Sequence, residues 1–271
     1  MINTLTSIEQ VERVYDTGCK PILVSCNDFN DYVCKYNTTA GSANLLFREY
    51  MSACFLKIWQ LQVPEFAFVY LKKHHAPKGI RNIQFDIPCF GSLYNNEYKE
   101  LDAFNSIISA SNKNKYANKV DLLKIILFDY WVSNEDRNHN NYNLMLKIAD
   151  DKYHFVPIDG NFAFHTGNQN RENYTLSIDE TLISSPLTSS LFTSKTFINE
   201  PIIENLENSY YICVQNCKNE IAGLIQDVPE MWQIDKAVEY NNLINFLFTD
   251  SWIAECWTTF LQHLQVSIIS K

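Results

Sequence analysis

The stretch Asn134-Glu135-Asp136-Arg137-Asn138-His139-Asn140-Asn141 and the later Ile158-Asp159-Gly160 carry the strongest signal in this chain. Within them, Asp136, Asn141 and Asp159 offer carboxylate and amide oxygens, the ligands that Mg²⁺ prefers in proteins. An Asp, an Asn five residues on and a second Asp beyond a short hairpin can together hold Mg²⁺ on a nucleoside triphosphate. The spacing therefore predicts a site for Mg²⁺ and a nucleotide.

The residues between the two motifs predict a β-hairpin over residues 143–158, with its turn at 149–152. Antiparallel pairing about that turn would set the first residue of the hairpin beside the last, so that Asn141 and Asp159 leave it at the same end. The alternative is a polar turn in which Asp and Asn only cap and reverse the chain. The apolar helix predicted over residues 120–132, directly before the loop, favours the site.

The charges of the three residues suggest how their roles divide. Asp159 carries a full charge and is the stronger expected Mg²⁺ ligand, while Asn141 is a neutral second ligand. Asp136 is expected to orient an acceptor hydroxyl and to accept its proton. Together these roles predict a kinase that transfers the γ-phosphoryl group of ATP to a hydroxyl.

Two residues upstream are expected to complete the nucleotide site. Lys35 lies in an apolar strand predicted over residues 32–36, where a lysine is costly unless it is paired or binds phosphate. Glu49 lies on the helix predicted over residues 43–60. A strand Lys paired with a helix Glu holds the α- and β-phosphates in protein kinases. Ordinary solvent-facing positions are the alternative, but the order of the motifs along the chain favours the pair.

The predicted phosphate loop departs from the common kinase patterns. It is the turn at residues 17–21, in which Gly18 is the one glycine, and no G-x-G-x-x-G or Walker A motif occurs. Asn-Glu, rather than His-Arg, precedes Asp136, and Gly-Asn, rather than Phe-Gly, follows Asp159. A conventional eukaryotic protein kinase is therefore a poor match.

The order of the predicted elements indicates an α+β fold with two lobes and a cleft between them. Residues 1–92 are expected to form a small β-rich nucleotide-binding lobe, and residues 93–271 a larger, mainly helical lobe with the catalytic loop and the metal site. Strands are expected at residues 11–15, 22–26, 32–36 and 65–71, and the connection between the lobes near residues 88–91.

A long polar segment, residues 166–200, follows the second motif. Loops of this length are usually functional or disordered, so we interpret it as an activation or substrate-binding loop. Its candidate phosphate acceptors are Ser184, Ser185, Thr188, Ser189, Ser190 and Ser194.

Composition narrows the class of protein. A net charge of −9 and a pI near 5.2 argue against direct nucleic-acid binding, because a basic surface is needed for that. No apolar run approaches the roughly 18 residues of a membrane span. The N-terminal residues do not resemble a signal peptide, so the eight cysteines are expected to be reduced and the protein to be cytoplasmic.

In this order, the motifs resemble the HipA-like kinase family, in particular its shorter stand-alone branch. The residues that carry the resemblance are Gly18 to Pro21, Tyr32 to Lys35, Arg48-Glu49, Asn134-x-Asp136-Arg137-x₃-Asn141-x-Asn143-Leu144, Ile158-Asp159-Gly160 and Pro229-x-x-Trp232.

The resemblance implies an α+β, two-lobed, protein-kinase-like fold with Ser/Thr kinase activity that uses ATP and Mg²⁺. By position, Asp136 would be the catalytic base, Asn141 and Asp159 the metal ligands, and Lys35 the phosphate-binding lysine with Glu49 as its partner. It further implies a protein substrate or autophosphorylation, for which the phosphate loop offers Thr17. An antitoxin-like partner protein is also expected, as in a toxin–antitoxin pair.

Two other functions fit the same residues. A small-molecule phosphotransferase on this fold would take cationic acceptors such as aminoglycosides, which an acidic cleft favours. A non-catalytic, nucleotide-binding pseudokinase that acts as an interaction module is favoured by the scarcity of glycine in the phosphate loop.

Overall fold

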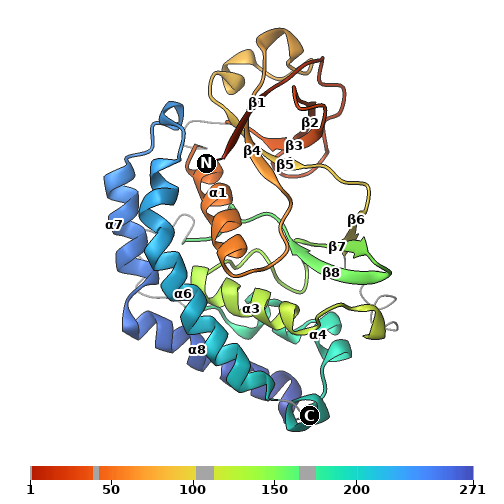
Figure 1. The fold of residues 1–271 in the computed structure, drawn as a ribbon, viewed down its shortest axis with the longest axis vertical. Coiled ribbons are helices and arrows are strands. Elements are labelled where there is room, and N and C mark those ends of the chain that lie inside the picture. Colours follow the sequence, from red (N-terminus) through yellow and green to blue (C-terminus); the bar gives the residue numbers. More distant parts are fainter. Residues whose placement is uncertain (1, 39–42, 102–112, 165–174, 200, 271) are drawn as a thin grey trace.

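The computed structural model describes residues 2–38, 43–101, 113–164, 175–199 and 201–270. A five-stranded sheet forms the N-terminal part of the molecule, and helices make up most of the remainder (Figure 1). The predicted α+β class, with a small β-rich part before a larger helical part, is confirmed.

The N-terminal sheet has the strand order β1-β4-β5-β3-β2, with β1 parallel to β4 and the other neighbours antiparallel. Three predicted strands are confirmed to within a residue or so at each end. The strands are β1 (Asn3–Thr6), β2 (Ile22–Ser25), β3 (Asp31–Lys35), β4 (Phe66–Tyr70) and β5 (Cys89–Leu93).

Two expectations for this part are wrong. Residues 11–15 form no strand, because Val14 makes only an isolated bridge to Ile22 and the Val11 N–H donates to His75 O at 2.9 Å. Two hydrogen bonds flank the bridge, from the Tyr15 N–H to Pro21 O at 2.8 Å and from the Leu23 N–H to Arg13 O at 3.0 Å, so the segment pairs with β2 at one position and does not extend into a strand. Residues 88–91 do not connect two lobes but lead into the central strand β5, whose glycine, Gly91, lies close to Val69 and Cys34.

A second sheet, of strands β6 (Tyr98–Leu101), β7 (Leu144–Ala149) and β8 (Lys152–Pro157), contains the predicted hairpin. Leu144 pairs with Pro157, and the Ile158 N–H donates to Asn143 O at 3.0 Å, so the predicted register is confirmed. The turn residues Asp150 and Asp151 have φ values of 50° and 57°. Two consecutive left-handed residues are what a tight two-residue hairpin turn requires.

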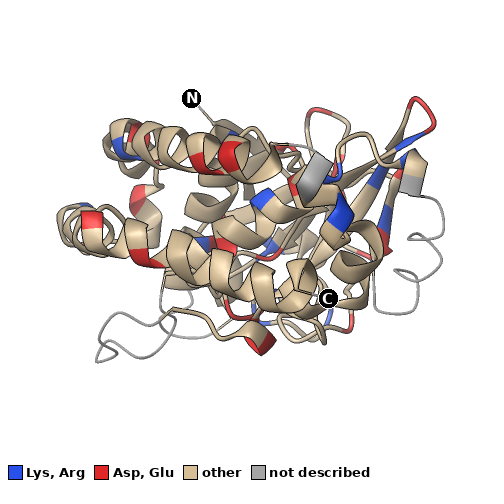
Figure 2. Ribbon diagram, turned by 90° about the horizontal axis from the view of Figure 1, so that it is seen from below, with Lys and Arg blue, Asp and Glu red and all other residues tan. Residues whose placement is uncertain are grey.

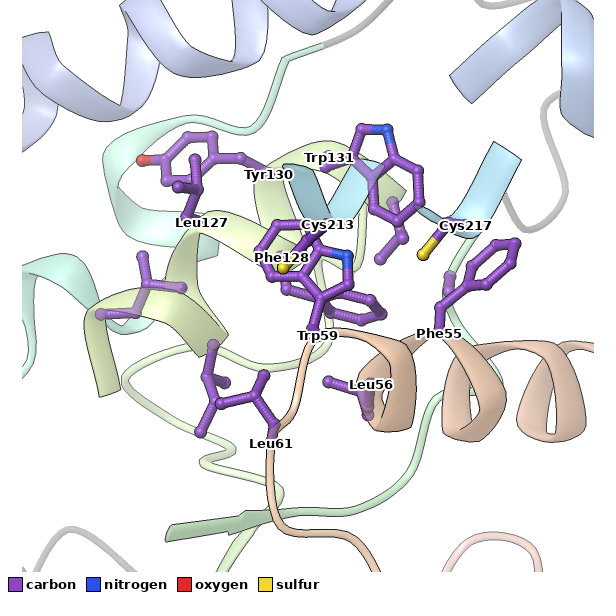
Figure 3. Close-up of a cluster of buried hydrophobic side chains, with 14 of the residues drawn as sticks. Phe55, Leu56, Trp59, Leu61, Leu127, Phe128, Tyr130, Trp131, Cys213 and Cys217 are labelled. Carbon is purple, nitrogen blue, oxygen red and sulfur yellow. The ribbon is translucent and has the colours of Figure 1, made fainter. Parts of the chain in front are cut away.

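Helices α1 (Ala43–Ile58) and α3 (Val120–Val132) form at the two predicted positions. Both contribute to one large core (Figure 3), in which the Trp59 and Trp131 rings stack with centroids 5.6 Å apart. Cys213 and Cys217 of α6 (Ile202–Gln226) also lie in this cluster. Although α1 follows β3 in the chain, its apolar face therefore belongs to the core of the helical part.

Hydrogen bonds join the C-terminal part of the chain to α1 and to the sheet. After α6 come α7 (Lys236–Leu247) and α8 (Asp250–Leu264), and the chain ends in a π-helical turn, Gln265–Ile269. The Tyr50 hydroxyl of α1 donates to Leu224 O at 2.9 Å, and the Trp232 indole N–H donates to Pro88 O at 2.8 Å. These bonds join the C-terminal helices to α1 and to the start of β5.

The polar segment predicted as a loop is largely helical where it is described. Residues 175–199 include two 3₁₀ turns, Ile178–Glu180 and Leu182–Ser184, and the short helices α4 (Pro186–Leu191) and α5 (Ser194–Asn199). Residues 166–174 and 200 lie outside the described residues.

Two of the predicted acceptors in this segment are structural instead. Ser185 and Thr188 are fully buried. The Ser185 hydroxyl caps α4 by accepting the Thr188 N–H at 3.2 Å, and the Thr188 hydroxyl donates to Leu182 O at 2.6 Å. Polar residues can thus stabilise short helices by capping, which composition alone does not distinguish from a loop.

All eight cysteines are free thiols. In the described part of the chain, no helix combines the length and apolar character needed to cross a lipid bilayer. Figure 2 shows acidic positions spread over several helices and loops, with basic positions among them.

We expect Phe55→Ala to lower the free energy of unfolding by about 3–5 kcal/mol, because Phe55 is fully buried where α1 meets α3. Phe29→Ala is the matched control, since Phe29 is 89% exposed, and should change stability by less than about 0.5 kcal/mol. Urea denaturation measures both. Equal losses for the two variants would show that α1 does not share the main core.

Candidate functional site

A cavity of about 590 Å³ lies among the N-terminal sheet, α1 and the β7–β8 hairpin. Ligand sites commonly have roughly 300–1,000 Å³, so the cavity is large enough for a nucleotide. All six residues predicted for the site line it, namely Gly18, Lys35, Glu49, Asp136, Asn141 and Asp159.

Lys35 stands between two carboxylates in this cavity. Its Nζ contacts Glu49 Oε1 and lies 2.7 Å from Asp159 Oδ1. Strand alternation accounts for the direction of the side chain, because Tyr32 and Cys34 on the same strand are buried against the other face of the sheet. The structure thus brings together the lysine of β3, the glutamate of α1 and the aspartate that follows β8.

Burial and charge act against each other on these three groups. Burial lowers the pKa of Lys35, but the carboxylates of Glu49 and Asp159 outweigh it and raise that pKa, so the lysine stays protonated. Burial raises the pKa of Glu49 more than Lys35 lowers it. For Asp159, burial also raises the pKa, but the charge and hydrogen bond of Lys35, with smaller contributions from Glu49 and Arg137, together outweigh it and the net shift is downward. Of the two carboxylates, Asp159 therefore favours the ionised form more strongly than Glu49 does.

Glu49 also holds the backbone that follows Asp159. Its Oε2 accepts the Gly160 N–H at 3.1 Å, while its other oxygen faces Lys35. Asp159 itself has φ of 58°, a left-handed conformation that Asp tolerates better than most residues. One buried carboxylate thus positions both the lysine and the Asp-Gly turn.

Gly160 is required by close packing. A Cβ added there would lie 2.3 Å from Ser52 Oγ and 2.4 Å from Ser52 Cβ on α1. Because real Cβ atoms do not approach others so closely, any side chain would push Asp159 away from α1. Gly18 differs, since a Cβ there would meet nothing within 4 Å, so close packing does not explain that glycine.

The loop that carries Asp136 is anchored by the next residue. The Arg137 guanidinium is fully buried and contacts Asp129 of α3, and it donates to Ile158 O at 2.8 Å and to Asn143 O at 3.3 Å. Burial raises the pKa of Asp129, while Arg137 and the Asn134 amide, 3.0 Å away, act to lower it. A single side chain therefore ties α3 to both strands of the hairpin.

Asp136 points into the cavity with its orientation set by the hairpin. Asn143 Nδ2 donates to Asp136 Oδ2 at 2.9 Å. The Asn141 N–H donates to Asn138 O at 3.1 Å, and the Asn138 N–H donates back to Asn141 O at 2.9 Å. These bonds shape the loop between the Asp and the Asn, and they leave the exposed Asn141 side chain beside the cavity.

Sequence reasoning missed several residues that build the site. Arg137 and Asn143 were noted only as parts of a motif, and Asp129, Ser52 and Asn161 were not singled out. An Asp inside an apolar helix, eight residues before an Arg, was the available signal for the buried pair. Nothing in the sequence pairs Ser52 with Gly160, because that contact joins segments far apart in the chain.

The oxygen atoms on the cavity wall fit a hard divalent cation. They come from the carboxylates of Asp159 and Asp136 and the amide of Asn141. Mg²⁺ is usually bound by one or two carboxylates, with phosphate oxygens and water completing its shell. Among the residues that the structure describes, no three His, Cys, Asp or Glu side chains gather as a metal-binding group.

We expect Arg137→Met to destabilise the protein by about 3–5 kcal/mol, because it leaves the Asp129 carboxylate buried without its partner. The double variant Asp129→Leu with Arg137→Met removes both charges and should recover part of this loss. Urea denaturation measures the midpoints. If the double variant lost as much stability as the two single variants together, the unpaired Asp129 carboxylate would not be the cause of the loss in Arg137→Met.

Gly160→Ala should displace the turn that carries Asp159 and destabilise the protein by about 1–3 kcal/mol through overpacking. Adding Ser52→Gly removes the atoms that clash, so the double variant should regain most of the loss. A double-mutant cycle of melting temperatures tests this coupling. If the effects of the two substitutions on the melting temperature simply added, residues 52 and 160 would not be coupled.

CtkA, a proinflammatory kinase of Helicobacter pylori, aligns with a TM-score of 0.50 and 14% identity over 99% of this chain and 96% of its own. HipA of Shewanella oneidensis MR-1, in a complex with HipB and operator DNA, aligns with a TM-score of 0.39 and 11% identity over 95% of this chain and 66% of its own.

The Golgi casein kinase with Mn and ADP bound aligns with a TM-score of 0.40 and 11% identity over 97% of this chain and 76% of its own. A search among curated proteins finds no match.

The similarity to CtkA supports a kinase-like fold. A sequence profile described as HipA-like kinase matches residues 8–254, a range that includes the Lys35–Glu49 pair, the Asp136 loop and Asp159. The chain therefore belongs to the HipA-like kinase family.

Proposed function

We propose that this protein transfers the γ-phosphoryl group of ATP to a Ser or Thr hydroxyl of a protein, in a reaction that requires Mg²⁺. The observation that carries the proposal is the Lys35 amino group between Glu49 and Asp159, in the same cavity as Asp136. Family membership supports a kinase-like phosphotransferase. We propose ATP as the donor, Mg²⁺ as the metal and a Ser or Thr hydroxyl as the acceptor.

In this proposal, residues 1–92 bind most of the nucleotide and residues 93–271 supply the reacting groups. Lys35 binds the α- and β-phosphates, and Glu49 keeps its amino group in place. Gly18 and its neighbours on the phosphate loop cover the phosphates with backbone groups. Asn141 and Asp159 would hold Mg²⁺, which supplies charge neutralisation on the phosphate oxygens.

Asp136 is the proposed base for the acceptor. The acceptor oxygen forms its bond to the γ-phosphorus, the bond to the ADP oxygen breaks, and the hydroxyl proton passes to the Asp136 carboxylate. The hydrogen bond from Asn143 occupies one carboxylate oxygen and leaves the other for the hydroxyl. This hydrogen bond supports the proposed role of Asp136 as the proton acceptor.

The chain's own hydroxyls also supply candidate acceptors. Thr17 is exposed on the loop that lines the cavity, and Ser184 and Ser189 are exposed near α4. Ser185 and Thr188 are excluded as acceptors in the folded protein, since both are fully buried. Self-labelling, if it occurs, is expected at the exposed hydroxyls.

Incubation with γ-labelled ATP and Mg²⁺ tests the proposal. Asp136→Ala should lower the rate of labelling by about a hundredfold or more, because it removes the base. The same variant should keep the rise in melting temperature that Mg²⁺–ATP causes, since the nucleotide contacts remain. Lys35→Met should lose both. Equal labelling of the wild type and Asp136→Ala, or none of either, would overturn the proposal.

Nucleotide binding without transfer is the second candidate. The observation in its favour is the phosphate loop, where Cys19 Sγ accepts a hydrogen bond from Asn161 Nδ2 at 3.7 Å and the exposed Gly18 is the one glycine. Under this reading, Mg²⁺–ATP raises the melting temperature but no label is transferred to protein. Label found in a small cationic acceptor, rather than in protein, would instead indicate a small-molecule phosphotransferase.

A further inference from the structure

The connection between β4 and β5 carries a concentrated positive charge. Residues 72–86 include four Lys or Arg residues and one Asp, a net charge of +3, while the whole chain has a net charge of −9, so the other residues together carry −12. We call residues 72–86 the basic platform. It contains two 3₁₀ turns, Lys73–His75 and Asn82–Phe85, and lies at the end of the molecule opposite the C-terminus (Figure 1). None of its residues lines the cavity, so the proposed transfer reaction does not use it.

Hydrogen bonds fix the first turn of the platform against the start of the chain. Ser7 Oγ accepts the Lys72 N–H at 2.9 Å and lies 2.9 Å from His75 Nδ1. The side chains of Ser7 and His75 are both buried. Gln10 Nε2 donates to Ala76 O at 2.7 Å. The backbone of the platform is therefore held in place, although this stretch contains neither a strand nor a long helix.

The second turn is held to the sheet and to the first turn. The buried Phe85 ring packs on Tyr36, directly after β3, with centroids 4.9 Å apart. Lys73 Nζ lies 2.8 Å from Asp86 Oδ1, so an ion pair joins the two turns. A surface that is already ordered loses less conformational entropy when a partner binds. The exposed groups of the platform are thus preorganised for binding.

The outer surface of the platform presents cations around one apolar side chain. Lys72, Lys78 and Arg81 are exposed, and none of the three forms an ion pair with a carboxylate of the described residues. Ile83 is 65% exposed. It lies three residues before the ion-paired Asp86, and residues three apart share one side of a 3₁₀ turn. This surface is complementary to an acidic segment that carries an apolar side chain.

The distribution of charge favours one class of partner. At physiological salt, exposed charges more than roughly 8 Å apart are largely screened from each other. A short acidic segment that stays on the platform therefore interacts mainly with the local charge of +3. A nucleic acid or an anionic membrane is a far larger polyanion, so it would also approach the acidic remainder of the chain and be repelled. A protein segment is thus favoured over these two polyanions.

We propose that the basic platform binds an acidic segment of a partner protein through Lys72, Lys78 and Arg81, with an apolar side chain of that segment packed on Ile83. The cations form charge-assisted contacts with Asp or Glu side chains. Ile83 sets the register of the segment, because it is the large apolar side chain that the platform exposes. This docking surface lies outside the cavity, so the inference does not rest on the proposed function.

Fluorescence anisotropy of a short labelled peptide, made of Asp and Glu around one central Leu, tests the proposal on the purified full chain. At an ionic strength of about 0.15 M the wild type should bind it with a micromolar dissociation constant. Lys78→Glu with Arg81→Glu should weaken binding by about tenfold or more, because two attractive contacts become repulsive. Lys195→Glu with Lys218→Glu is the matched control, since both lysines are exposed outside the platform and the net charge changes equally. The control should change the dissociation constant by less than about twofold.

A second peptide, with Ser in place of the central Leu, separates the apolar contact from the charges. It should bind the wild type about fivefold more weakly than the Leu peptide, and Ile83→Ser should weaken binding of the Leu peptide by a similar factor. Melting temperatures of the ligand-free variants confirm that each is folded. An unchanged affinity of Ile83→Ser for the Leu peptide would overturn the contact with Ile83.

Three other outcomes would overturn the docking surface itself. The first is no binding of the Leu peptide by the wild type. The second is an equal loss of binding in the two charge variants, which would mean that only the net charge of the chain matters. The third is tighter binding of a single-stranded oligonucleotide or of phosphatidylserine vesicles than of the Leu peptide.

Discussion

The site depends on the interactions of one buried group, the guanidinium of Arg137. It reaches Asp129 in α3 and two backbone carbonyls at the ends of the hairpin strands, so it fixes the loop between them. A buried charge of this kind is tolerated only when its hydrogen bonds are satisfied, which ties the loop to one conformation. Asp136 and Asn141 take their positions on the cavity wall from that conformation.

A second constraint comes from the helix that carries Glu49. Its apolar face packs in the same core as α3, α6 and α8, and hydrogen bonds from Tyr50 and Trp232 join the helical part to α1 and β5. Glu49 in turn contacts Lys35 and the Gly160 N–H. The helical core therefore sets the position of the lysine on the sheet, and the two parts of the molecule share one site through α1.

Sequence patterns performed well where local rules decide the outcome. The hairpin register followed from its turn, and the helix over residues 120–132 followed from its apolar run, because neither depends on distant residues. They failed where distant contacts decide it. Residues 11–15 are rich enough in apolar side chains for a strand, yet they pair with β2 only at the single bridge between Val14 and Ile22. Residues 175–199 are polar, yet capping and burial of Ser185 and Thr188 make short helices of them.

By itself the sequence determined the six predicted residues that line the cavity. It also determined that a hairpin brings Asn141 and Asp159 to one end, since a strand has a period of two and a turn sets its register. Only the tertiary structure decided that Lys35 stands between Glu49 and Asp159 and that Ser52 excludes any side chain at residue 160. Each of these contacts joins segments far apart in the chain. Such contacts depend on how the helices and the sheet pack together, which local sequence patterns do not encode.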